Sequence, residues 1–186
     1  MKMKKRQRSC ERTMTLDKNT KQKIKSALQK FYEEEPSLIN FGLREECMCF
    51  RIAYYLQQLF YGEYFVDCEY NRQYDTSGHS AKKTSDGKEF IADIIVHKRN
   101  CNETIKDDYL CFEIKHWKEK NKKRHQKDVM VLKELTGSRG RFSYHHGFHI
   151  ILGEELNDTK IMMFEHGRNT TEDYALFADF FKDEEQ

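Results

Sequence analysis

Three charged residues lie inside otherwise apolar runs of the sequence. Asp93 is part of FIADIIVH (90–97), and Glu113 and Lys115 are part of YLCFEIK (109–115). Both runs are rich in β-branched and aromatic residues, which favours buried strands. Because alternate side chains of a strand face the same way, Glu113 and Lys115 are expected to project from one face. The pattern predicts a carboxylate and an ammonium group side by side.

The polar segment between the two runs predicts an antiparallel hairpin. If Lys98 pairs near Tyr109, Asp93 lies roughly opposite Glu113. Two carboxylates in apolar strands repel each other and lose hydration, a cost that a bridging divalent cation offsets. Mg²⁺ held by few carboxylates can bind substrate phosphate and lower the pKa of a bound water. With a lysine to orient or deprotonate that water, or to neutralise developing charge, these residues match the needs of phosphodiester hydrolysis.

Another carboxylate, Glu45, belongs to a stretch with helical periodicity between Leu43 and Phe60. Glu45 lies three residues before Met48 and seven before Ile52, so it falls on the apolar face of the expected helix. That face is an unusual place for a charged side chain.

The remaining elements follow from periodicity and from capping or breaking residues. The expected order is helix, three strands, helix and strand, followed by an edge strand and a closing helix. The long polar segment 71–88 is expected to be a mobile loop. The elements are a first helix from Asp17 or Asn19 to Pro36, a helix over 43–60, strands over 64–70, 90–97 and 109–115, a helix over 124–135, strands over 147–152 and 160–164, and a helix over 171–181.

Length and composition indicate one folded domain. The chain has 186 residues, of which 34% are charged and 13% aromatic, with a net charge of +2. We expect a basic, flexible leader over 1–20 and a single domain over 21–186. Six cysteines without a CxxC pair, no signal peptide and no long apolar run predict reduced thiols in a soluble, cytoplasmic protein with no membrane partner.

Four ordered strings resemble the PD-(D/E)XK nuclease superfamily. IAD followed by EIK is similar to its D…ExK signature, and a closer likeness is to a largely uncharacterised prokaryotic and viral group with VDCEYNR-like and PDIIVH-like strings. The resemblance implies an α/β fold with a restriction-endonuclease-like αβββαβ core, whose central mixed sheet is flanked by helices. Ala92 replaces the proline that names the motif. The matching strings here cover 66–72, 92–97, 113–115 and 128–136.

The resemblance also implies roles for individual residues. Asp93 and Glu113 would be ligands of Mg²⁺ or Mn²⁺, the Ile114 carbonyl would be a further ligand, and Lys115 would be the catalytic lysine. The first helix of the family contributes a glutamate to the metal site. Glu45 matches this glutamate by its face, with its neighbour Glu46 as the alternative.

Weaker candidates surround this set. The basic run that follows the expected strand over 109–115 is either a contact for nucleic-acid phosphates or a solvated helix start. Glu69 and Asp128 are secondary site candidates, and a zinc site at His145, His146 and His149 is disfavoured because neighbouring strand residues face opposite sides. The basic candidates are Arg72, Lys118, Lys120, Lys122, Lys123 and Arg124.

Two classes of function remain open. The first is a metal-dependent endonuclease that hydrolyses phosphodiester bonds, with DNA favoured over RNA by resemblance only. The second is a catalytically silent nucleic-acid-binding or assembly module of a defence or mobile-element system; the intact D…ExK set argues against it, because a decayed site would lose such costly charges. Cutting two strands would suit a homodimer, and the lack of a separate reader module would suit cleavage directed by a partner subunit or by substrate structure.

Overall fold

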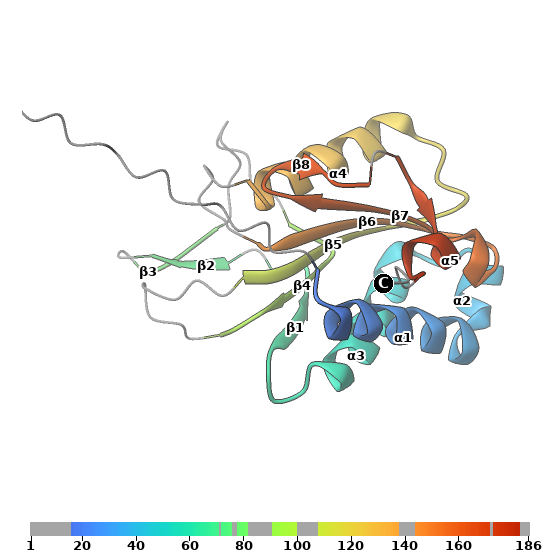
Figure 1. Ribbon diagram of the computed structural model, residues 1–186, viewed down its shortest axis with the longest axis horizontal. Helices are drawn as coiled ribbons and strands as arrows, with labels where there is room; N and C mark the ends of the chain where they lie inside the picture. Colours follow the sequence, from blue (N-terminus) through green and yellow to red (C-terminus); the bar gives the residue numbers. More distant parts are fainter. Residues whose placement is uncertain are drawn as a thin grey trace, which may run out of the picture.

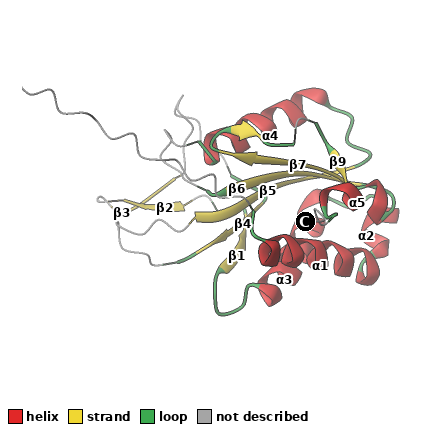
Figure 2. Cartoon of the chain, viewed as in Figure 1, coloured by secondary structure: helices red, strands yellow, loops and turns green. Residues whose placement is uncertain are grey.

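A seven-stranded mixed sheet forms the centre of the described part of the chain (Figure 1). The computed structural model describes residues 16–70, 72–75, 78–81, 91–99, 108–137, 144–171 and 173–182. The fold is α/β, with helices on both faces of the sheet (Figure 2). The helices are α1 (Lys18–Glu34), α2 (Pro36–Asn40), α3 (Glu45–Leu59), α4 (Lys122–Leu135) and α5 (Phe177–Phe180), with the 3-10 turn η1 (Leu156–Asp158). The strands are β1 (Phe65–Cys68), β2 (Arg72–Asp75), β3 (Gly78–Ala81), β4 (Ile94–His97), β5 (Asp108–His116), β6 (His146–Leu152), β7 (Lys160–Glu165), β8 (Arg168–Asn169) and β9 (Ala175–Leu176).

The sheet has the order β1-β4-β5-β6-β7-β8, with β9 also paired to β7. Strands β5 and β6 are parallel, and the other neighbouring pairs are antiparallel. A parallel pair needs a crossover connection, and α4 supplies it between β5 and β6. The predicted helix, three strands, helix and strand are present in order. The strand predicted over 160–164 is β7, but it is not at the edge of the sheet, because β8 and β9 pair with it on the side away from β6.

The sheet separates two apolar cores. On one face, α1, α2, α3 and α5 pack over side chains such as Phe112 and Phe148, whose rings stack 5.0 Å apart. On the other face, α4 packs over Cys111 and Phe164 (Figure 1). Strand β5 therefore contributes side chains to both cores and is buried from Leu110 onward. Its charged residues must be accommodated inside the protein.

Helix α1 begins at Lys18, before the expected end of the leader. The Asp17 side chain accepts a hydrogen bond from the Thr20 backbone N–H at 3.0 Å, which satisfies one of the free donors of the first turn. Residues 18–20 of the expected leader are therefore helical. Residues 1–15 lie outside the described part of the chain.

Two local predictions were wrong. The segment expected to be one long loop contains the antiparallel hairpin β2–β3, because extended backbones can pair without apolar periodicity in the sequence. The expected closing helix over 171–181 is reduced to the four residues of α5. Its earlier part includes β9, which pairs with Lys160 and Ile161 of β7.

The hairpin formed by β4 and β5 was predicted correctly at the end that carries the charged residues. Ile94 pairs with Phe112, so Asp93 lies beside Glu113 in the register. At the other end an irregularity after Val96 shifts the register, and His97 pairs with Asp108. The expected pairing of 98 with 109 is therefore not observed.

Asp67 joins β1 to β4 through charge. Its Oδ2 lies 2.7 Å from His97 Nε2, and the Arg99 guanidinium donates to both carboxylate oxygens. Burial raises the pKa of Asp67, but hydrogen bonds from Arg99 and His97 outweigh this and bring it below the ordinary 3.8. The ionised carboxylate thus stabilises the folded state above pH 3.8, and this contribution is lost as the pH falls through the folded pKa.

We expect Asp67→Asn to lower the free energy of unfolding by about 1–3 kcal/mol at neutral pH. The difference from wild type should shrink as the solution is acidified, because the wild-type carboxylate then becomes neutral as well. Urea denaturation over a pH series measures both effects. The control is Glu63→Gln, which removes an exposed ion pair with Lys23 and should have little effect. A deficit that is the same at every pH would contradict the proposed charge contribution.

Candidate active site

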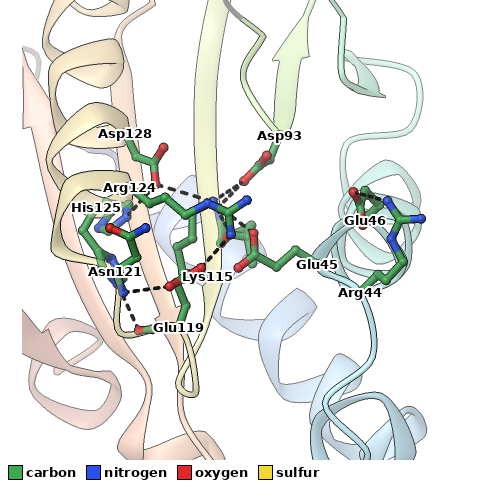
Figure 3. A network of polar contacts seen from close by, with 12 residues as sticks. Arg44, Glu45, Glu46, Asp93, Lys115, Glu119, Asn121, Arg124, His125 and Asp128 are labelled. Carbon is green, nitrogen blue, oxygen red and sulfur yellow. Dashed lines mark hydrogen bonds and ion pairs between the residues drawn. The ribbon is translucent and has the colours of Figure 1, made fainter.

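The Lys115 side chain lies among carboxylates that come from three other elements (Figure 3). Its Nζ is 3.3 Å from Glu45 Oε2, 3.6 Å from Asp93 Oδ2 and 3.5 Å from Asp128 Oδ2. It also donates a hydrogen bond to the Ile114 carbonyl at 3.0 Å. Only 7% of the Lys115 side chain is exposed, so these oxygens replace most of the water that would solvate an ammonium group.

Backbone contacts hold Asp93 at the start of β4. Its Oδ2 accepts a hydrogen bond from the Ile114 N–H at 2.7 Å, which ties the side chain to β5. Its own carbonyl accepts a bond from the Glu69 N–H at 3.1 Å. Glu69 has a positive φ of 48° at the end of β1, and its side chain is exposed. Its described contact with the site is therefore through its backbone.

The two helices each supply one carboxylate. Glu45 is the first residue of α3 and points toward Lys115, whereas Glu46 pairs with Arg44 away from it (Figure 3). The structure therefore brings Glu45 to the site and leaves Glu46 out. Asp128 lies on the face of α4 that packs against the sheet and is buried, although the sequence marked it only as a secondary candidate.

The charges of this group are unevenly balanced. Burial, followed by the charges of Asp93 and Asp128, raises the pKa of Glu113 well above 4.5, and the charge of Lys115 only partly opposes this. For Lys115, burial lowers the pKa, but the surrounding carboxylates have the larger effect and raise it above its usual value. The lysine is therefore an ammonium group at neutral pH, and Glu113 has a strong tendency to keep its proton.

His149 completes the group from β6. The parallel register places it beside Glu113, and its fully buried ring lies 3.7 Å from Asp128 through Nε2. Its Nδ1 is 2.6 Å from the Tyr174 hydroxyl. The sequence offers only one hint of this, a histidine in the middle of the apolar strand GFHIIL, and its position beside Glu113 depends on how the strands pair.

The other histidines of this strand lie elsewhere. His146 faces the opposite side of the sheet and pairs with Glu165 at 2.9 Å, while the His145 ring packs edge-on against Tyr109. The three histidines of the disfavoured zinc site are therefore not brought together.

In the described part of the chain, no group of three or more His, Cys, Asp or Glu side chains that could hold a metal ion is found. Asp93 and Glu113 nevertheless fit Mg²⁺ or Mn²⁺, because such ions are commonly held by one or two carboxylates and complete their shell with water and phosphate. Burial is the largest cause of the raised pKa of Glu113, followed by the charges of Asp93 and Asp128, and a bound cation would favour the ionised carboxylate against both effects.

The basic candidates over 118–124 lie between the end of β5 and the first turn of α4, and Arg124 reaches this group (Figure 3). Arg124 is 62% exposed, donates to Glu119 at 2.6 Å and extends from α4 over the carboxylates (Figure 3). Lys118 and Lys120 lie 5.0 and 6.0 Å from the Trp117 ring centre. Lys122 and Lys123 are exposed in the first turn of α4. The side chain of Arg72 is not described, although its backbone belongs to β2.

Comparison with protein-family models, with curated proteins and with solved structures gives no match. Among the described helices, none combines the length and the apolar character needed to cross a membrane.

Proposed function

We propose that this protein is a metal-dependent nuclease that hydrolyses phosphodiester bonds of DNA, with a restriction-endonuclease-like core of the PD-(D/E)XK type. The observation that carries the proposal is the position of Lys115, whose ammonium group lies within 3.6 Å of carboxylates from α3, β4 and α4. Glu113, two residues earlier on β5, faces the same side. Apart from Asp128 of α4, these are the residues of the D…ExK resemblance together with the helix glutamate.

The arrangement of the elements supports the same family of folds. In chain order, α3, β1, β4, β5, α4 and β6 give the αβββαβ series, interrupted by the hairpin β2–β3. Asp93 immediately precedes β4, and Glu113 lies on the adjacent central strand β5. A fold alone does not specify an activity, so the proposal depends on the charged group.

Asp93 and Glu113 would hold the cation, and Glu45 would assist from α3. A bound Mg²⁺ or Mn²⁺ would supply charge stabilisation and a more acidic water molecule. The residues of the chain would fix that chemistry in place. Asp93 is already immobilised by the Ile114 N–H, and Glu113 is held within the buried part of β5.

Lys115 would act as a cation. Its pKa is raised by the neighbouring carboxylates, so it does not readily accept a proton from water in this state. It can instead donate hydrogen bonds to the attacking oxygen or to the phosphate and offset the negative charge that develops there. Of the roles considered for this lysine, orientation and charge neutralisation are favoured over deprotonation.

One observation favours the alternative function, a catalytically silent nucleic-acid-binding or assembly module. No group of three metal-binding side chains is found among the described residues, and the Lys115 amine lies between the carboxylates. If the amine stays there when substrate binds, it would take the place of a catalytic cation. The basic residues beside the site would then bind phosphates without cleavage.

Cleavage assays separate the two functions. Purified protein is incubated with single-stranded, duplex and branched DNA and with RNA, in Mg²⁺, Mn²⁺ or EDTA, with Lys115→Ala as the matched variant. We expect cutting of DNA that requires the metal and is absent in the variant. Binding of these substrates without cutting in any metal would favour the silent module instead.

Arg124→Ala should weaken binding of nucleic acid without changing sequence preference, because an exposed guanidinium at the site contacts phosphate. The slope of log K against log salt concentration should fall by about 1, as expected when one phosphate contact is removed. Fluorescence anisotropy in a salt series measures this slope. Lys133→Ala, which removes an exposed cation at the other end of α4, is the control. An equal effect of both substitutions would argue for general charge attraction rather than a contact at the site.

A further inference from the structure

His149 is a fully buried imidazole whose two nitrogens face different partners. Its Nδ1 lies 2.6 Å from the Tyr174 hydroxyl, in the segment before β9, and its Nε2 lies 3.7 Å from Asp128 Oδ2. The same Asp128 oxygen is 3.5 Å from Lys115 Nζ. A continuous series of polar contacts thus runs from Tyr174 to the catalytic lysine.

The hydrogen-bonding possibilities limit the protonation of this ring. Burial, with the charges of Asp128 and Asp173, raises the pKa of Tyr174 to about 12, so its hydroxyl keeps its proton. When that hydroxyl donates to Nδ1, the neutral imidazole carries its proton on Nε2. When the ring is positively charged, both nitrogens carry protons. In both of these states an Nε2–H group faces the Asp128 carboxylate, whereas a neutral ring that donates from Nδ1 to the Tyr174 oxygen would leave Nε2 without a proton.

The contact with His149 affects the pKa of Asp128. Burial raises the pKa of this carboxyl, but the interaction with His149 and the charge of Lys115 outweigh burial and lower it below 3.8. Asp128 Oδ2 and His149 Nε2 are nevertheless both buried and lack a hydrogen bond of ordinary geometry in the described structure. An apolar side chain at 149 would avoid the cost of burying this polar atom. A role beyond packing accounts for a polar ring at this position.

We propose that His149, held by Tyr174, is a positioning residue that fixes Asp128 and through it orients the Lys115 ammonium group. The inference rests on the proposed nuclease function and adds a residue outside the D…ExK set. His149 cannot touch a substrate because it is fully buried, and it acts through its polar contact with Asp128. The Oδ2 atom of Asp128 in turn is one of the carboxylate oxygens that hold the Lys115 ammonium group between α4 and α3 (Figure 3).

Kinetics of three variants test the positioning role. His149→Leu removes both polar contacts, His149→Gln retains an amide donor, and Tyr174→Phe removes only the hydroxyl. We expect His149→Leu to lower kcat by about 10- to 100-fold, as for other residues that orient a catalytic group, with KM changed less than about twofold. Glutamine should recover part of the loss, and Tyr174→Phe should fall between wild type and leucine. His146→Leu is the control, since it replaces another buried histidine of β6 on the opposite face.

An NMR measurement tests the contact without requiring activity. In protein with ¹⁵N-labelled histidine, His149 should show a protonated Nε2, and its signal should shift in Asp128→Asn. A ring protonated only on Nδ1 would overturn the inference. So would kcat in His149→Leu equal to that of an active wild type. If wild type cuts no substrate while Nε2–H responds to Asp128, the nuclease function fails and the positioning contact stands.

Discussion

Replacing Lys115 by arginine is expected to abolish cleavage while the fold is retained. Arginine keeps the positive charge that the carboxylates of Glu45, Asp93 and Asp128 require, so the buried group remains neutralised. The planar guanidinium is larger than an ammonium group and presents its donors in a fixed fork. It cannot reproduce the contact with the Ile114 carbonyl and the carboxylates at once. We expect kcat to fall by about 10³-fold, a loss typical of a charge-stabilising donor.

The matched variant is Lys115→Met, which removes the charge but keeps a long side chain. Loss of the positive charge leaves buried carboxylates without a cation and should lower the free energy of unfolding by about 3–5 kcal/mol. Thermal unfolding and single-turnover cleavage of the two variants separate charge from geometry. The Lys115→Arg variant should unfold near the wild-type temperature, and the Lys115→Met variant should unfold well below it. If arginine cleaves at the wild-type rate, charge alone is sufficient and the proposed orientation by Lys115 is wrong.

Replacing Glu113 by glutamine is expected to stabilise the metal-free protein and to abolish cleavage. Burial and the nearby charges of Asp93 and Asp128 make the ionised form of Glu113 costly, and glutamine removes that charge at nearly constant volume. We expect a gain of about 0.5–2 kcal/mol, the range common for substitutions that relieve strain at a functional site. This corresponds to a rise in Tm of about 1–8 °C for a domain of this size.

The raised pKa of Glu113 makes the stability of the wild-type protein depend on pH. The pKa of Glu113 is raised in the folded protein above the ordinary 4.5, so the folded state binds a proton that the unfolded state has released. Wild-type stability should therefore fall as the pH rises from 4.5 toward the folded pKa. Glu113→Gln should lack this component of the pH dependence.

Differential scanning calorimetry over a pH series, with and without Mg²⁺, tests both parts. Mg²⁺ should raise the Tm of wild type more than that of Glu113→Gln, because the variant lacks one of the two proposed ligands. The control is Glu46→Gln, which changes an exposed neighbour of Glu45 that pairs with Arg44. A lower Tm for Glu113→Gln than for wild type in EDTA would show that the ionised carboxylate stabilises this fold.

The expected opposite changes in stability and cleavage share one cause. Several carboxylates are held close together with a single buried ammonium group, an arrangement that favours binding of a further cation over stability of the free protein. Asp67 offers a contrast at the other end of β4. There two basic partners compensate a single carboxylate, and its ionised form supports the fold.

The sequence by itself determined the elements that have strong periodicity and the central charged residues. The stripe of Ile24, Leu28 and Phe31 predicted α1, and the apolar strands predicted the central hairpin, because burial on one or two faces leaves a regular pattern. Glu113 and Lys115 could be placed on one face by alternation alone. The extra hairpin β2–β3 and the short final helix left no such pattern, since backbone pairing determines them.

Only the tertiary structure decided which distant residues share the site. Asp128 comes from α4 and His149 from a strand whose parallel register with β5 cannot be read from local periodicity. Periodicity had favoured Glu45 over Glu46, and the packing of α3 places Glu45 beside Lys115 while Glu46 pairs with Arg44. Local patterns specify the direction of a side chain within its own element. The distances between Lys115 and its partners depend on how separate elements pack, which is a property of the whole fold.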